Sequence, residues 1–185
     1  MALLIVALAA CASPSDEPTA APQPPARASV LPQELAGVAD FCAVPGDTAA
    51  AAVPAGSRAV AIGAQDRLDI RYAPFPAAVR CTLRTRAQWE QLWKALDARD
   101  APPSAPESGM VVLAAAGTIS TEGHDIAIDG VWIHGDTATV SVRERTVGDG
   151  CAAGQLEAYP TAAVRIPAVP VVRFRETLLV GEPCF

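Results

Sequence analysis

The clearest periodic pattern in the chain lies in residues 86–98. Apolar side chains recur there at spacings of three and four residues, as on one face of an α-helix: Trp89, Leu92, Trp93 and Leu96. Thr85 is a good N-cap, and Gln88 stands at the position that a capping box requires. The pattern predicts an amphipathic helix over residues 86–98, with both tryptophans in a core rather than in a ligand platform.

Two segments after this helix have the patterns of β-strands. Residues 110–116 form a continuous apolar run, which is typical of a central buried strand. Residues 125–133 alternate, but their second half is out of phase with the first. One extra residue at Asp129-Gly130 restores the phase, which predicts a β-bulge there.

Three more strands follow. After a turn at residues 134–136, Ala138, Val140 and Val142 face one way and polar residues face the other. Val164 and Ile166 mark the next strand. Residues 169–175 mark the last long strand, and the break at Pro170 favours an edge position.

These elements predict an α+β fold. Successive strands with short links usually form an antiparallel meander. We therefore expect a sheet of about five strands with one amphipathic α-helix packed on it. Alternating strand directions place the loops at residues 117–124 and 146–158 at one end, which we call the upper end, and residues 134–136 at the other.

The N-terminus has the pattern of an export signal. Residues 3–10 form an apolar run that is too short to span a bilayer, which needs about 20 residues. Leu8-Ala9-Ala10-Cys11 resembles the lipobox of bacterial lipoproteins, in which the cysteine receives the lipid. We expect a signal peptide over residues 1–10 and lipidation of Cys11, including acyl chains such as palmitate. Ala12, rather than Asp, after the cysteine favours the outer membrane, facing the periplasm.

The rest of the chain divides into three segments that differ in composition. Residues 11–29 are rich in Pro and Ala and predict a disordered tether. Residues 30–57 are ambiguous and are expected to be partly ordered. Residues 58–185 have the patterning of one globular domain.

The cysteines after Cys11 are even in number: Cys42, Cys81, Cys151 and Cys184. In an exported protein this predicts two disulfides, for which three connectivities are possible. Cys151 lies on an upper loop, and the last strand carries Cys184 back to the upper end. We therefore favour Cys151–Cys184, which leaves Cys42–Cys81.

The net charge of −6 and the scattered basic residues argue against a nucleic-acid partner. Strand arginines recur in the C-terminal half: Arg143, Arg145, Arg165, Arg173 and Arg175. They are interpreted either as a basic stripe for an acidic partner or as a solvated sheet face.

Several segments together resemble a known family. The helix Thr85-Arg86-Ala87-Gln88-Trp89-Glu90-Gln91-Leu92-Trp93 is followed by the strand Met110-Val111-Val112-Leu113-Ala114-Ala115-Ala116-Gly117. The turn Thr121-Glu122-Gly123-His124-Asp125-Ile126 comes next, and then Gly148-Asp149-Gly150-Cys151, Tyr159-Pro160 and residues 163–174. Over roughly residues 81–175 the chain is similar to the C-terminal domain of PrcB-family proteins.

The resemblance implies a role without catalysis. The namesake of the family is an accessory subunit of a surface protease complex, so an interaction or accessory module of the cell envelope is implied, with no catalytic residues to carry over. This sequence departs from the family at Glu122-Gly123, at His124 and at Val147-Gly148.

Few residues of the sequence are candidates for catalysis or for binding a metal or a phosphate. His124 and His134 are expected at opposite ends of the domain, which argues against a shared metal site. Ser120, His124 and Asp125 share one loop, whereas a catalytic triad converges from separate elements. His124 is expected to face solvent, and Gly148-Asp149-Gly150 indicates a turn rather than a phosphate loop. We expect no enzyme activity, cofactor or metal.

We therefore expect a lipid-anchored accessory module that binds a protein partner through its upper loops. Their candidate residues are Gly117, Glu122, Gly123, His124, Gly148, Asp149 and Gly150. The alternative is a periplasmic lipoprotein that binds a small ligand or a metal. An exposed apolar patch at the upper loops would favour the first hypothesis, and a pocket lined by polar groups would favour the second.

Overall fold

The structure is a computed structural model of the chain, and it describes residues 30–46, 52–70, 73–97, 105, 107–120, 123–148, 151, 154 and 157–183. In chain order the elements are η1 (Gln33–Val38), β1 (Cys42–Ala43), β2 (Arg58–Ala59), η2 (Ala64–Asp66), β3 (Arg67–Leu68), β4 (Ala78–Leu83), α1 (Arg86–Ala95), β5 (Met110–Ala116), β6 (Asp125–His134), β7 (Thr137–Thr146), β8 (Thr161–Ile166) and β9 (Val171–Val180). No helix in these ranges is long and apolar enough to cross a membrane.

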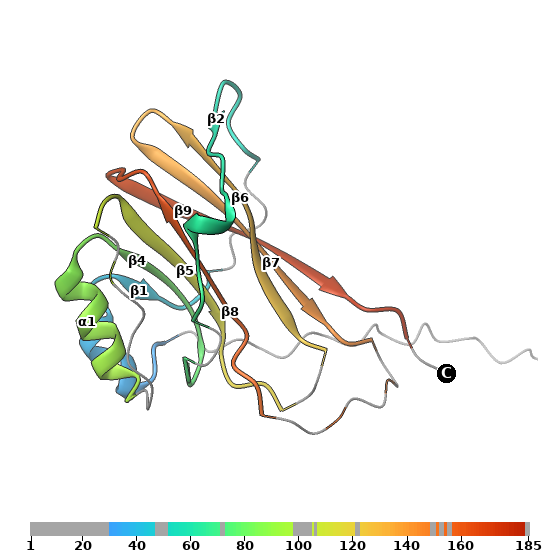
Figure 1. The fold of residues 1–185 in the computed structure, drawn as a ribbon. Coiled ribbons are helices and arrows are strands. Elements are labelled where there is room, and N and C mark those ends of the chain that lie inside the picture. The colour runs from blue at the N-terminus through green and yellow to red at the C-terminus, as the bar shows by residue number, and fades with distance from the viewer. Residues whose placement is uncertain are drawn as a thin grey trace, which may run out of the picture.

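The strands form two sheets, and this corrects the expected single meander. One sheet has the order β1-β4-β5-β8-β3 and the other has the order β2-β6-β7-β9. In Figure 1, α1 lies on one side of the five-stranded sheet and the four-stranded sheet lies on the other. The α+β description holds broadly, but among the described elements β-strands far outnumber helices.

The pattern of β5 explains why there are two sheets. Val111, Leu113 and Ala115 belong to a core shared with α1 and η1. The alternate residues Met110, Val112 and Ala114 belong to a second core shared with β6 and β7. Because successive side chains of a strand point to opposite faces, this apolar run needs cover on both sides, and one helix covers only one.

Strand directions alternate along the chain, as expected. Strands that are consecutive in the chain, however, are not always neighbours in a sheet. The β6–β7 hairpin leaves the sheet of β5 and stacks on it, and β8 returns to pair antiparallel with β5. β9 then pairs with β7 in parallel, from Thr137↔Val171 to Thr146↔Val180. The predicted edge position of this last strand is confirmed.

Local predictions from the sequence are confirmed. Thr85 caps α1, and a capping box joins it to Gln88. The rings of Trp89 and Trp93 pack edge-on at 5.7 Å, within the core. The register of β6 and β7 shifts between Ile128 and Gly130, where the bulge was expected.

The end of the helix differs from the expectation, and the segment that was treated as ambiguous contains a short helix. Helix α1 ends at Ala95 rather than at residue 98, because Asp97 has a left-handed φ of 47°, which is incompatible with a continuing helix. Leu35 and Val38 of η1, in the segment treated as ambiguous, are completely buried in the core beneath α1. Residues 1–29 lie outside the described residues, so the expected signal peptide, Cys11 and tether are not described.

The Cys42–Cys81 disulfide is present. It joins β1 to β4, where these two residues lie directly opposite each other. Both cysteines are buried, so the bond holds the N-terminal segment against the core.

Candidate interaction surface

The loops before β6 and after β7 meet at the upper end of the four-stranded sheet. Gly123 has a φ of 85°, and a Cβ atom at this position would lie 2.6 Å from Cγ1 of Val147. His124, the next residue, lies beside Glu144 of β7. The structure thus brings Gly123 and His124 to the segment that contains Gly148.

The end of β9 joins these loops. The N–H of Gly181 donates to the carbonyl oxygen of Thr146 at 2.9 Å. A Cβ atom on Gly148 would lie only 1.9 Å from the carbonyl oxygen of Glu182, so only glycine allows this approach. The upper end is therefore built from three chain segments: the two predicted loops and the end of the last strand, which was expected to return there.

Other predicted residues lie elsewhere or outside the described residues. Gly117, with a φ of 86°, packs against the backbone of Ala77 and Ala78 at the start of β4. The remaining predicted loop residues Glu122, Asp149 and Gly150 lie outside the described residues, and so do Cys11 and Cys184.

Cys151 also lies at the upper end. Its sulfur is 3.6 Å from the carbonyl oxygen of Glu182, and it takes part in a disulfide. Its bonding partner lies outside the described residues, so the pairing with Cys184 stays a prediction.

The expected exposure of His124 is wrong. Its side chain is only 14% exposed, and its Nε2 lies 3.5 Å from Oε1 of Glu144, itself 10% exposed. Its Nδ1 is buried without a hydrogen-bond partner in the described part of the chain. Asp125 instead lies 3.6 Å from Arg143, so the carboxylate beside His124 is that of Glu144.

His134 is the last residue of β6 and His124 precedes the first. The two histidines therefore lie at opposite ends of this strand, as expected. Within the described ranges, no group of three or more His, Cys, Asp and Glu residues lies close enough to hold a metal ion.

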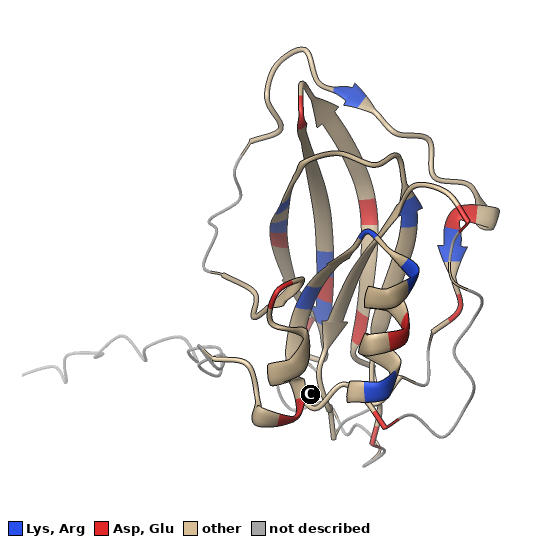
Figure 2. Cartoon of the chain, turned by 90° about the vertical axis from the view of Figure 1, so that its left-hand side faces the viewer, with Lys and Arg blue, Asp and Glu red and all other residues tan. Residues whose placement is uncertain are grey.

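The strand arginines, interpreted from the sequence as either a basic stripe or a solvated sheet face, are divided between two sheets. Arg165 lies on β8 of the five-stranded sheet, and the others lie on β7 and β9. Arg143 is held by Asp129 at 2.9 Å, and the hydrogen bond and negative charge of this carboxylate raise the pKa of the guanidinium. Charges of both signs also alternate along α1 (Figure 2).

A buried ion pair that was not predicted from the sequence joins the two sheets. Arg80 of β4 donates through Nε and Nη2 to the carboxylate of Glu176 on β9, at 2.8 and 2.7 Å. Its Nη1 donates to the carbonyl oxygens of Val79 and Ala115. The guanidinium is only 2% exposed, so its charge is neutralised and its donors are used inside the domain.

An exposed apolar segment lies at the upper end, where β9 ends. Leu178, Leu179 and Val180 are 41%, 39% and 65% exposed, at the end of β9. Leu178 is the register partner of Glu144, and Val180 that of Thr146, so the segment lies beside the upper loops. The strand predicted over residues 169–175 does not include these residues, although their apolar run is visible in the sequence.

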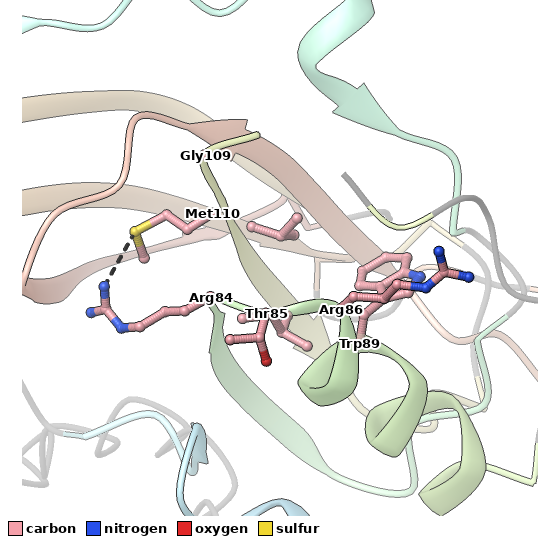
Figure 3. Close-up of a pocket in the computed structure, with 8 residues that line it drawn as sticks. Arg84, Thr85, Arg86, Trp89, Gly109 and Met110 are labelled. Carbon is pink, nitrogen blue, oxygen red and sulfur yellow. Dashed lines mark hydrogen bonds between the residues drawn. The ribbon is translucent and has the colours of Figure 1, made fainter. Parts of the chain in front are cut away.

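A small hollow lies at the start of α1, away from the upper end (Figure 3). Residues of β4, α1 and β5 line it, including Thr85, Trp89 and Met110. Its volume of about 30 Å³ suits about two water molecules. Arg84 points away toward Met110 and donates to the carbonyl oxygens of Val169 and Pro170, which fixes the turn before β9.

The architecture is that of a two-sheet β domain covered by one helix. Residues 110–167 match the family described as PrcB C-terminal. This range begins with β5 and ends just after β8, so α1 and β9 fall outside it. No curated protein and no solved structure matches the chain.

Proposed function

We propose that this chain is a lipid-anchored accessory module of the bacterial cell envelope, which assists a protein partner without catalysis. A protease complex is the first partner to test, because the PrcB C-terminal match covers residues 110–167. The anchor is the lipid on Cys11, and the location is the outer membrane on its periplasmic side. The support for the anchor is the lipobox resemblance of Leu8-Ala9-Ala10-Cys11.

One observation carries the proposal of a protein partner. The exposed residues Leu178, Leu179 and Val180 adjoin the loops that contain His124 and Gly148. Contiguous apolar surface on a folded domain is characteristic of interaction sites, because leaving it in water is unfavourable. Binding a partner would remove these side chains from water.

Close contacts at the upper end also support the proposal. The backbone of Gly148 lies against that of Glu182, and Gly123 lies against Val147. These contacts hold the residues after β9 beside the segment after β7, so the apolar segment and this loop form one surface.

Crosslinking in intact envelopes tests the proposal. Full-length protein is crosslinked in cells, purified and analysed by mass spectrometry, and Cys11→Ala serves as the variant without a lipid site. We expect one envelope protein to be recovered with the wild-type chain, and to be lost with Cys11→Ala. A second variant, Leu179→Glu, should reduce recovery while leaving the protein anchored.

Two results would count against the proposal. If the chain remains anchored and no envelope protein is recovered with it, the hypothesis of a protein partner is wrong. If the wild-type chain and Cys11→Ala are found in the membrane fraction in equal amounts, the hypothesis of a lipid anchor on Cys11 is wrong.

A further inference from the structure

The four-stranded sheet has an outer face, which is turned away from the five-stranded sheet. Its inner face is apolar, and residues such as Val140, Val142 and Val172 pack there in the second core. Successive side chains of a strand point to opposite faces, so the odd-numbered residues of β7 and β9 lie on the outer face. None of the described helices covers this face, since α1 and η1 pack on the other sheet and η2 lies beside β8.

Four arginines form a row on this face, which we call the arginine ladder. Arg173 and Arg175 occupy alternate positions of β9, and Arg175 lies opposite Ser141 of β7. Arg143 and Arg145 occupy the next two alternate positions of β7. Each step of two residues advances about 6.6 Å, so the ladder presents one arginine per step over about 20 Å.

Most of the positive charge of the ladder is not compensated within the described part of the chain. Arg143 is paired with Asp129 at 2.9 Å and lies 3.6 Å from Asp125. The other three form no ion pair with a described residue: Arg145, Arg173 and Arg175. Both aspartates belong to β6, so the negative charge of this face lies over β6 and the unpaired positive charge over β7 and β9.

The geometry of the face selects a helical partner. The main-chain groups of a sheet lie in its plane, so the outer face offers side chains and no N–H or C=O groups. A segment laid on this face must therefore pair its own main-chain groups, as an α-helix does. Every fourth residue of a helix lies on the same side, with a repeat of about 6 Å. This repeat is close to the step of about 6.6 Å between the arginines.

Apolar side chains lie at both ends of the ladder. Trp132 of β6 faces Thr139 of β7, beside the first arginine, and its ring lies within 2.5 Å of where a Cβ atom on Gly130 would be. Leu179, 39% exposed, is the register partner of Arg145 and belongs to the apolar segment of the upper end. Tryptophan and arginine are enriched among the residues that dominate binding at protein interfaces. The face therefore continues the proposed interaction surface from the upper end along the sheet.

We propose that the arginine ladder binds an acidic α-helix of the partner protein, with carboxylates at every fourth residue. The inference rests on the proposed accessory function and names the chemistry of the partner. Arginine and carboxylate form short, directional hydrogen bonds, which gives such a pairing its selectivity. An anionic membrane fits this face less well, because its negative charge would also meet the exposed Asp125 and Asp129. A helix places its charges over β7 and β9 alone.

A helical peptide is the probe. It is capped, alanine-based and about four turns long, so that a row of glutamates at every fourth position spans about the length of the ladder. The control peptide has the same composition, but its glutamates are spread around the helix. Binding of each peptide to the purified full chain is measured by fluorescence anisotropy. We expect the row peptide to bind at least about tenfold more tightly than the control.

NMR spectroscopy locates the peptide in the same samples. The indole N–H signal of Trp132 should shift when the row peptide binds, because this ring lies on the outer face beside the ladder. The signals of Trp89 and Trp93 should stay unchanged, since both rings are buried in the core beneath α1.

Removal of charge tests the ladder itself. Arg173→Gln with Arg175→Gln removes two positive charges and should weaken binding of the row peptide about tenfold. The matched control, Arg86→Gln with Lys94→Gln, removes the same charge from α1 and should change the affinity less than about twofold. Arg145→Gln, at an exposed position, is a single variant that tests the ladder if the double variant does not fold, and it should weaken binding about threefold.

Three outcomes would overturn the inference. The first is equal binding of the row peptide and its control, and the second is an equal loss of affinity in the two double variants. The third concerns vesicles that contain phosphatidylglycerol, tested with Cys11→Ala so that no lipid anchor contributes. Binding to these vesicles without binding to the row peptide would assign the ladder to a membrane.

The proposed function fails separately from this inference. If crosslinking recovers an envelope protein but the row peptide does not bind, the accessory function stands and the acidic helix is wrong. If the row peptide binds but no envelope protein is recovered from an anchored chain, the accessory function is wrong and the ladder remains a site for acidic helices.

Discussion

At the scale of single residues, the important polar contacts join positions that are far apart in the chain. Arg80 and Glu176 are separated by 96 residues, and together they hold β9 against the five-stranded sheet. His124 and Glu144 form a second shielded pair, 3.5 Å apart, at the upper end. These contacts join β9 to the five-stranded sheet and the start of β6 to β7.

Arg80→Met is expected to lower the free energy of unfolding by about 3 kcal/mol, because the Glu176 carboxylate then stays shielded without its partner. The additional change Glu176→Met should restore part of this loss, since no uncompensated charge remains. Urea denaturation measures both variants.

The control for this pair is Arg86→Met. Arg86 forms an exposed pair with Glu90 on α1, at 2.8 Å, and its loss should cost at most about 0.5 kcal/mol. Equal costs for Arg80→Met and Arg86→Met would show that burial adds nothing to the first pair.

At the scale of elements, the segment that leaves β9 is positioned by glycine. Gly148 lets the chain pass the carbonyl oxygens of Gly181 and Glu182, and no side chain fits between them. The exposed end of β9 is held beside the loop after β7 by this close approach.

Gly148→Ala is expected to destabilise the domain by about 1–3 kcal/mol, because its Cβ forces the backbone at Glu182 to move. Gly37, in η1, has open space around the position of a Cβ atom, so Gly37→Ala should change stability by less than about 1 kcal/mol. Thermal unfolding of the two variants compares them. If they unfold at the same temperature, the contact with Glu182 does not constrain the upper end.

At the scale of the whole molecule, a covalent link joins an N-terminal segment of the domain to the core. Cys42–Cys81 attaches the N-terminal segment, including η1, to β4. Cys151 holds a second link at the upper end, for which Cys184 is the predicted partner.

Replacing Cys42 and Cys81 by alanine is expected to cost about 2–4 kcal/mol of stability, because the unfolded chain gains freedom. Peptide mapping of the unreduced protein should recover Cys42 with Cys81 and, separately, Cys151 with Cys184. A peptide that joins Cys81 to either C-terminal cysteine would contradict this connectivity.

The accuracy of prediction from the sequence depended on the range of the interaction. The capping box of Thr85 and Gln88 and the bulge at Asp129-Gly130 involve residues that are close in the chain, and they were predicted correctly. The burial of His124 was not, because it depends on Glu144 of another strand. Whether the strand arginines share one face depends on sheet membership in the same way, and Arg165 lies in a different sheet from the rest.

The sequence by itself determined where α1 and strands β5 to β8 lie, because backbone geometry couples side chains three, four or two residues apart. It also determined that strand directions alternate and that the last strand is an edge. Only the tertiary structure decided that there are two sheets, that β9 pairs in parallel with β7, and that Leu178 to Val180 stay exposed beside the upper loops. The reason is that strand adjacency depends on how both faces of β5 are covered, and that cover comes from residues distant in the chain.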